Sequence, residues 1–176
     1  MAEYSDGKVI EKEWENSVRA RRAMELFRQG YNCAQSVFLA FEDYYEIDRS
    51  TALKLSSSFG GGMGRLREVC GAVSGMFLTV GMLMGYDAPD DYKAKKEHYE
   101  RIQYLAGQFK AVNGSIVCRE LLERQAQAQK TDKNIPIAVT TDPSPELRTP
   151  EYYKKRPCPE LVGIAAAIVE EYLAEQ

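Results

Sequence analysis

Histidine is almost missing from this chain, in which His98 is the only one. A serine or cysteine hydrolase needs a base beside its nucleophile, and histidine most often supplies it. His98 precedes Ile102 by one turn of an amphipathic stretch, where a lone histidine is usually a packed side chain. We therefore expect no hydrolase and assign no ligand role to His98.

An excess of charge of either sign is also missing. The chain has 23 Lys and Arg against 26 Asp and Glu, mixed along its length, for a net charge of -3. This balance gives no electrostatic reason to expect nucleic acid as a partner. Residues 1–30 are charged almost throughout and lack the apolar stretch of an export signal. We expect a cytoplasmic protein, where thiols are normally kept reduced.

No uninterrupted apolar run is long enough to be a convincing membrane span. Residues 69–86 carry no charge and approach the minimum length, but four glycines interrupt them: Gly71, Gly75, Gly81 and Gly85. We expect a buried central helix here rather than a membrane span. The two glycine pairs, each spaced by one turn, predict two flat patches that allow another helix to pack closely or give access to something small.

Strand-like alternation of apolar and polar residues is absent, whereas apolar positions at helical spacing occur almost everywhere. The sequence predicts one all-α domain over residues 1–176, a bundle of about six to seven helices around the glycine-rich one. Six of the seven prolines fall in residues 130–159, so we expect an extended excursion without helix there. The glycine cluster at residues 60–64 lacks the lysine and preceding strand of a phosphate loop; it predicts positive φ and close backbone approach.

The chain has only four cysteines, and no two of them form a Cys-x-x-Cys pair. A zinc knuckle and a thioredoxin-type motif are thereby excluded. Each cysteine lies in or next to the first turn of a predicted helix and at helical spacing from apolar neighbours. The four are Cys33, Cys70, Cys118 and Cys158.

Helix starts favour thiolates, because free backbone N–H groups and the helix dipole stabilise negative charge. Four such positions can converge on one electropositive pocket, and we predict that the four sulfurs lie within about 8 Å of one another. The alternative is that the cysteines only fill the core as small apolar side chains, as cysteine often does.

The stretch Cys70-Gly71-Ala72-Val73-Ser74-Gly75, with one cysteine upstream and two downstream, resembles a family of small bacterial and archaeal proteins described as redox-active. That family is named for its four-cysteine pattern. Residues 32–35 and the glycine cluster also look like family features. The resemblance implies an all-helical domain whose cysteines act together, with Gly71, Ala72 and Gly75 as the surrounding motif and candidate cofactor contacts.

Three functions remain open at this stage. The first is thiol–disulfide exchange or electron transfer by Cys33, Cys70, Cys118 and Cys158, of the oxidoreductase class, with a redox partner protein or a small oxidant. The second is a Cys₄ site for an iron–sulfur cluster or zinc, with the same residues as ligands. The third is a non-catalytic binding or scaffold role. A homodimer is compatible with each, and sequence cannot choose among the three disulfide pairings.

Overall fold

The computed structural model describes residues 14–129 and 139–176, and the secondary structure of these residues is helical. No strand occurs among those residues, so the prediction of an all-α fold is confirmed. Along the chain the elements are η1 Trp14–Asn16, α2 Val18–Arg28, α3 Cys33–Leu39, η2 Glu42–Tyr44, α4 Arg49–Ser57, α5 Gly60–Met63, α6 Gly71–Met84, α7 Tyr92–Asn113, α8 Cys118–Gln129, α9 Pro150–Lys155 and α10 Cys158–Ala174.

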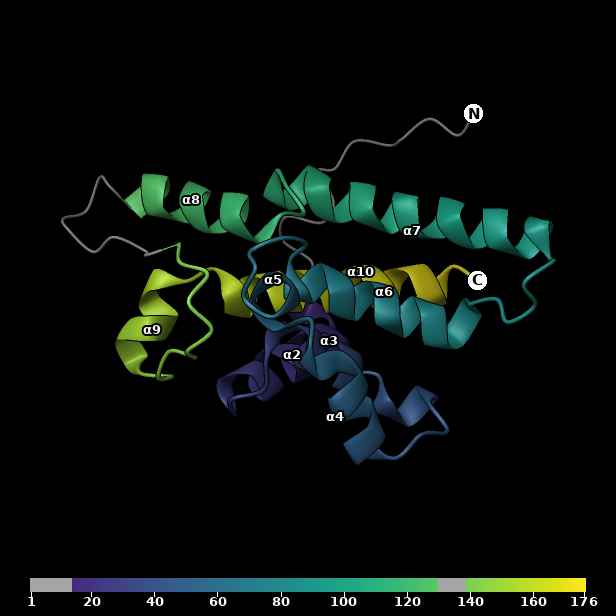
Figure 1. Cartoon of the computed structure of the whole chain (residues 1–176), viewed down its shortest axis with the longest axis horizontal. Coiled ribbons are helices and arrows are strands. Elements are labelled where there is room, and N and C mark those ends of the chain that lie inside the picture. The colour runs from purple at the N-terminus through teal and green to yellow at the C-terminus, as the bar shows by residue number, and fades with distance from the viewer. Residues whose placement is uncertain (1–13, 130–138) are drawn as a thin grey trace.

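Two helices, α6 and α10, form the centre of the fold. In Figure 1 they run side by side, with α7 along one side of them and α2 and α3 on the other, as the packing of α10 against α2, α6 and α7 also shows. The first half of α6 is buried, and α10 is buried from Leu161 to Val169. The sequence predicts α6 as the one central helix, whereas in the structure α10 is a second central helix with at least as many buried residues. Within the described residues, no helix is long and apolar enough to cross a membrane.

The first glycine pair of α6 allows this helix to lie directly on α3. A Cβ atom on Gly71 would come within 2.9 Å of the Cβ atom of Cys33, and one on Gly75 would come within 2.7 Å of the Ala34 carbonyl oxygen. Real Cβ atoms do not approach so closely, so only glycine permits this helix spacing. The prediction of close packing is confirmed for this pair.

The second glycine pair does not pack against a helix, so the expectation of close packing is not met there. A Cβ atom on Gly81 would meet nothing within 4 Å, and Gly85 is the residue that ends α6. Gly81 instead lines an open apolar groove of about 470 Å³ with Phe77 and Met82.

The proline-rich segment also differs from expectation. Residues 130–159 were predicted to contain no helix, but α9 forms within them because Thr149 caps its first turn and Pro150 has the φ of a helical first residue. Residues 130–138 lie outside the described part of the chain. His98 is half-buried, packs edge-to-face on Tyr86 and is not among the residues that line the cysteine pocket described below.

Candidate redox site

A strained loop links the glycine cluster to α6. Six of the seven residues from 61 to 67 have φ between +59° and +76°, and three of them are not glycine: Met63, Arg65 and Arg67. Left-handed backbone costs a side chain-bearing residue about 1 kcal/mol or more. The expected positive φ and close approach are confirmed, because a Cβ atom on Gly62 would lie 2.7 Å from that of Cys118. This left-handed path of the backbone places Arg65 and Arg67 beside the cysteines.

A short antiparallel bridge fixes Cys70 and Cys118 at two helix starts. Val69 pairs with Val117, the Cys70 amide donates to the Ile116 carbonyl at 2.8 Å, and the Cys118 amide donates to the Glu68 carbonyl at 2.7 Å. Cys70 is the N-cap of α6 and Cys118 is the first residue of α8. Both are nearly inaccessible, with exposed fractions of 4% and 8%.

Cys33 and Cys158 begin α3 and α10 and are half-buried. Asn32 and Gln35 form a capping box around Cys33, in which the Asn32 side chain accepts from the Gln35 amide at 2.9 Å and the Asn32 amide donates to the Gln35 side chain at 3.0 Å. At Cys158 the prolines on either side favour the helix start. The expectation that all four cysteines lie at helix starts is therefore confirmed.

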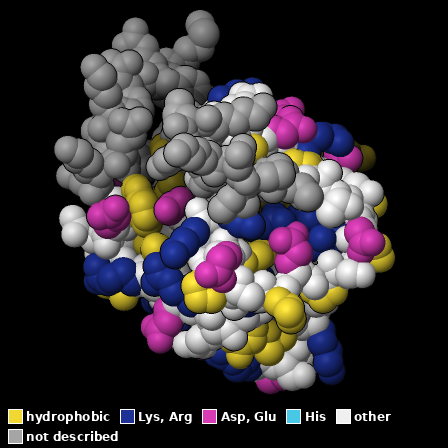
Figure 2. Space-filling view, turned by 90° about the vertical axis from the view of Figure 1, so that its left-hand side faces the viewer, with side chains coloured by type: hydrophobic (Ala, Val, Ile, Leu, Met, Phe, Trp, Pro, Cys, Tyr) yellow, Lys and Arg dark blue, Asp and Glu magenta, His cyan; other side chains and the backbone are white. Residues whose placement is uncertain are grey.

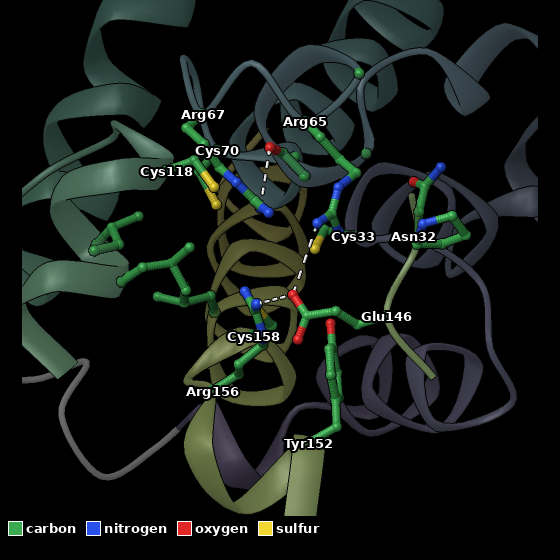
Figure 3. A pocket seen from close by; sticks show the side chains of 18 of the residues that line it. Asn32, Cys33, Arg65, Arg67, Cys70, Cys118, Glu146, Tyr152, Arg156 and Cys158 are labelled. Carbon is green, nitrogen blue, oxygen red and sulfur yellow. Dashed lines mark hydrogen bonds and ion pairs between the residues drawn. The ribbon is translucent and has the colours of Figure 1, made fainter. Parts of the chain in front are cut away.

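All four cysteines line one pocket of about 290 Å³. Figure 3 shows them around the same opening, supplied by α3, α6, α8 and α10. Cys33 and Cys70 thus border the same cavity. The exact span of the four sulfurs stays a prediction.

The two half-buried cysteines influence each other's ionisation. A hydrogen bond with the Cys158 thiol, together with the positive charge of Arg148 and the Gly61 amide, lowers the pKa of Cys33 from 9.0 to about 7 against the opposing effect of burial. The same hydrogen bond and burial raise the pKa of Cys158 well above its usual value. The lowered pKa favours a thiolate at Cys33, and the raised pKa favours the protonated form of Cys158.

The two inaccessible cysteines stay protonated. Burial raises the pKa of Cys70 strongly, and the nearby Cys33 and Cys118 add to this. Burial also raises the pKa of Cys118, partly offset by the charge of Arg67. The site thus holds one accessible pair and two buried thiols.

Four arginines line the same pocket, and the only carboxylate among the described lining residues is Glu146. Arg65, Arg67 and Arg156 point into the opening in Figure 3, where Glu146 lies between Arg65 and Arg156. On the face that carries α9, Lys and Arg side chains gather with isolated acidic ones between them (Figure 2). No sequence pattern marks these arginines as site residues, because only the fold brings residues 65–67 and 148–156 together.

The three predicted motif residues beside Cys70 lie partly in the pocket lining and partly in the core. Gly71 lines the pocket, whereas Ala72 is fully buried in the core and Gly75 lies against α3. Their cofactor contacts stay a prediction. No group of three or more His, Cys, Asp or Glu side chains in the described part of the chain is arranged to hold a metal ion. The Cys₄ metal site therefore also stays a prediction.

The sequence also matches a known protein family. A family model described as "Putative redox-active protein (C_GCAxxG_C_C)" matches residues 31–172. The chain belongs to this family. The four cysteines in the name of the C_GCAxxG_C_C family correspond in number to those of the pocket, the only four in the chain. No curated protein and no solved structure gives a match to the chain.

Proposed function

We propose that this C_GCAxxG_C_C protein performs thiol–disulfide exchange, with Cys33 as the nucleophile and Cys158 as the resolving thiol. The observation that carries the proposal is that Cys33 and Cys158 line one pocket together with Arg148, and that these neighbours lower the pKa of Cys33 to about 7. Both are half-buried and so within reach of a substrate, unlike the buried Cys70 and Cys118.

The reaction has two steps, written here for a small disulfide RSSR. The Cys33 thiolate attacks one sulfur, which forms a mixed disulfide between Cys33 and RS and releases the other RS group as a thiolate. Cys158 then loses its proton to that released thiolate and attacks the Cys33 sulfur. The Cys33–Cys158 disulfide forms and the second RS group leaves; in sum two protein thiols are oxidised and RSSR is reduced to two thiols.

Trapping experiments test this assignment. The reduced protein is treated with bis(2-hydroxyethyl) disulfide, its remaining thiols are alkylated, and its peptides are identified by mass spectrometry. We expect a Cys33–Cys158 crosslink in the natural sequence, a stable mixed disulfide on Cys33 in Cys158→Ser, and no reaction in Cys33→Ser. The matched control is Cys118→Ser, which removes a buried thiol of the same pocket and leaves the crosslink in place.

Metal analysis of the purified protein decides between thiol–disulfide exchange and the alternative of a Cys₄ metal site. The protein is purified without oxygen, and its iron and zinc are measured per chain together with the thiols that react in the native state. One zinc or one cluster per chain, with Cys33 unreactive until the metal is removed, would replace the proposal. A core role for the cysteines would show as four unreactive thiols without metal.

A further inference from the structure

The positive charge of the pocket exceeds what its own carboxylate balances. Glu146 forms ion pairs with both Arg156 and Arg65, the second at 3.8 Å between Arg65 Nη2 and Glu146 Oε1. Arg67 and Arg148 have no acidic partner among the described residues. Two arginines of the redox pocket thus have no carboxylate partner among the described residues.

Arg67 is the stronger indication, because its side chain is buried and yet incompletely bonded. Only 3% of the residue is exposed. Its Nε donates to the Thr140 carbonyl at 2.8 Å and its Nη1 to the Gly61 carbonyl at 3.5 Å, while Nη2 is buried without a hydrogen-bond partner. Buried guanidinium groups are normally paired, so a donor left free beside a cavity indicates a missing acceptor.

Arg148 repeats this arrangement at the accessible cysteine pair. Its guanidinium lies 4.2 Å from the ring centre of Phe27 and 4.8 Å from that of Tyr152, which fix its plane. Nη2 donates to the Tyr31 carbonyl at 3.4 Å, and Nη1 is buried without a partner. The two free donors, together with the N-termini of α6, α8 and α10, form a preorganised binding environment for an anion.

We propose that the substrates of this site are small anionic disulfides and the corresponding thiols, whose carboxylate, sulfonate or phosphate group is bound by Arg67 and Arg148. This inference adds a substrate class to the proposed function and rests on it. The cavity of about 290 Å³ suits a molecule of this size better than a protein segment. The acid group would hold the substrate while Cys33 attacks its disulfide bond.

A charge series of small disulfides tests the inference. The probes are bis(2-sulfonatoethyl) disulfide, the neutral bis(2-hydroxyethyl) disulfide and the cationic cystamine. Each rate with Cys33 is divided by the rate of the same probe with free 2-mercaptoethanol, which removes intrinsic reactivity. We expect the anionic probe to be favoured over the neutral one by about tenfold or more, with a preference that declines as salt is added.

The ratio of anionic to neutral rates separates substrate binding from thiolate stabilisation, because a changed pKa of Cys33 alters both rates equally. Arg67→Gln and Arg148→Gln should each reduce the ratio severalfold, and Glu146→Gln should raise it. Arg119→Gln is the control, since Arg119 pairs with Glu68 outside the pocket lining. Equal normalised rates for all probes would overturn the inference while the proposed exchange by Cys33 stands.

A binding measurement covers the case in which Cys33 reacts with no disulfide and the proposed function fails. Ethanesulfonate, which contains no disulfide, is titrated into the Cys33→Ser protein and followed by NMR. Saturable shifts that disappear in Cys33→Ser/Arg67→Gln support the anion site. Absence of saturable shifts, with the protein folded in the same spectra, refutes it.

Discussion

Cys158 should control the ionisation of Cys33 as a hydrogen-bond donor, and replacing Cys158 tests this directly. In Cys158→Ala the donor is lost and the pKa of Cys33 should rise from about 7 toward 9.0. In Cys158→Ser a hydroxyl remains to donate, so the pKa should stay low. The pair of variants separates the hydrogen bond from the mere removal of a sulfur atom.

The size of the effect follows from ionisation and nucleophilicity. At pH 6 a thiol with a pKa of 7 is about 9% thiolate, against about 0.1% for a pKa of 9, roughly a ninetyfold difference. The more acidic thiolate is intrinsically the weaker nucleophile, by about eightfold for a Brønsted slope of about 0.45. A complete return to 9.0 would therefore slow Cys33 at pH 6 by about tenfold.

The sign of the effect should reverse in alkaline solution. Above the higher pKa both proteins are fully ionised, and the alanine variant then carries the stronger nucleophile, so it should react about eightfold faster than the natural protein. A variant that only loosens the pocket would change the rate in one direction at every pH. The crossing of the two pH profiles is thus specific to a changed pKa.

The assay is the rate of alkylation of Cys33 by iodoacetamide between pH 5 and 10, followed on its own peptide by mass spectrometry. Buried Cys70 and Cys118 serve as slow internal references. The reasoning is refuted if Cys158→Ala keeps the inflection near pH 7, or if the natural protein shows it near pH 9. The first result would assign the low pKa to Arg148 and the backbone amides, and the second would remove the thiolate altogether.

Two further predictions concern the packing and the cap beside the site. Gly75→Ala should lower the free energy of unfolding by about 1–3 kcal/mol in urea, because the added Cβ atom would lie 2.7 Å from α3. Gly81→Ala on the same helix is the control: its Cβ atom meets nothing, so the change should be neutral or stabilising by up to about 1 kcal/mol. Equal effects of the two substitutions would contradict the close contact at Gly75. Asn32→Asp keeps a capping oxygen but adds a negative charge next to Cys33, so the alkylation profile of Cys33 should move to higher pH, and an unchanged profile would show that the cap does not face the thiolate.

The sequence alone determined the helical class and the position of each cysteine along its helix. These are local properties: the apolar spacing gives the helices, and Asn32 and the prolines beside Cys158 mark where two of them begin. The glycine pair of Cys70-Gly71-Ala72-Val73-Ser74-Gly75 also indicated close packing, because glycine inside a helix is costly unless another chain segment approaches it.

Only the tertiary structure decided which cysteines are accessible and what surrounds them. Cys33 and Cys158 are far apart in the sequence, and nothing local indicates that they line one pocket half-buried while Cys70 and Cys118 are buried. The same holds for the arginines, which reach the pocket from a strained loop and from the segment around α9. Their charges act through space, so their effect on the thiols depends on distances that spacing along the chain does not contain.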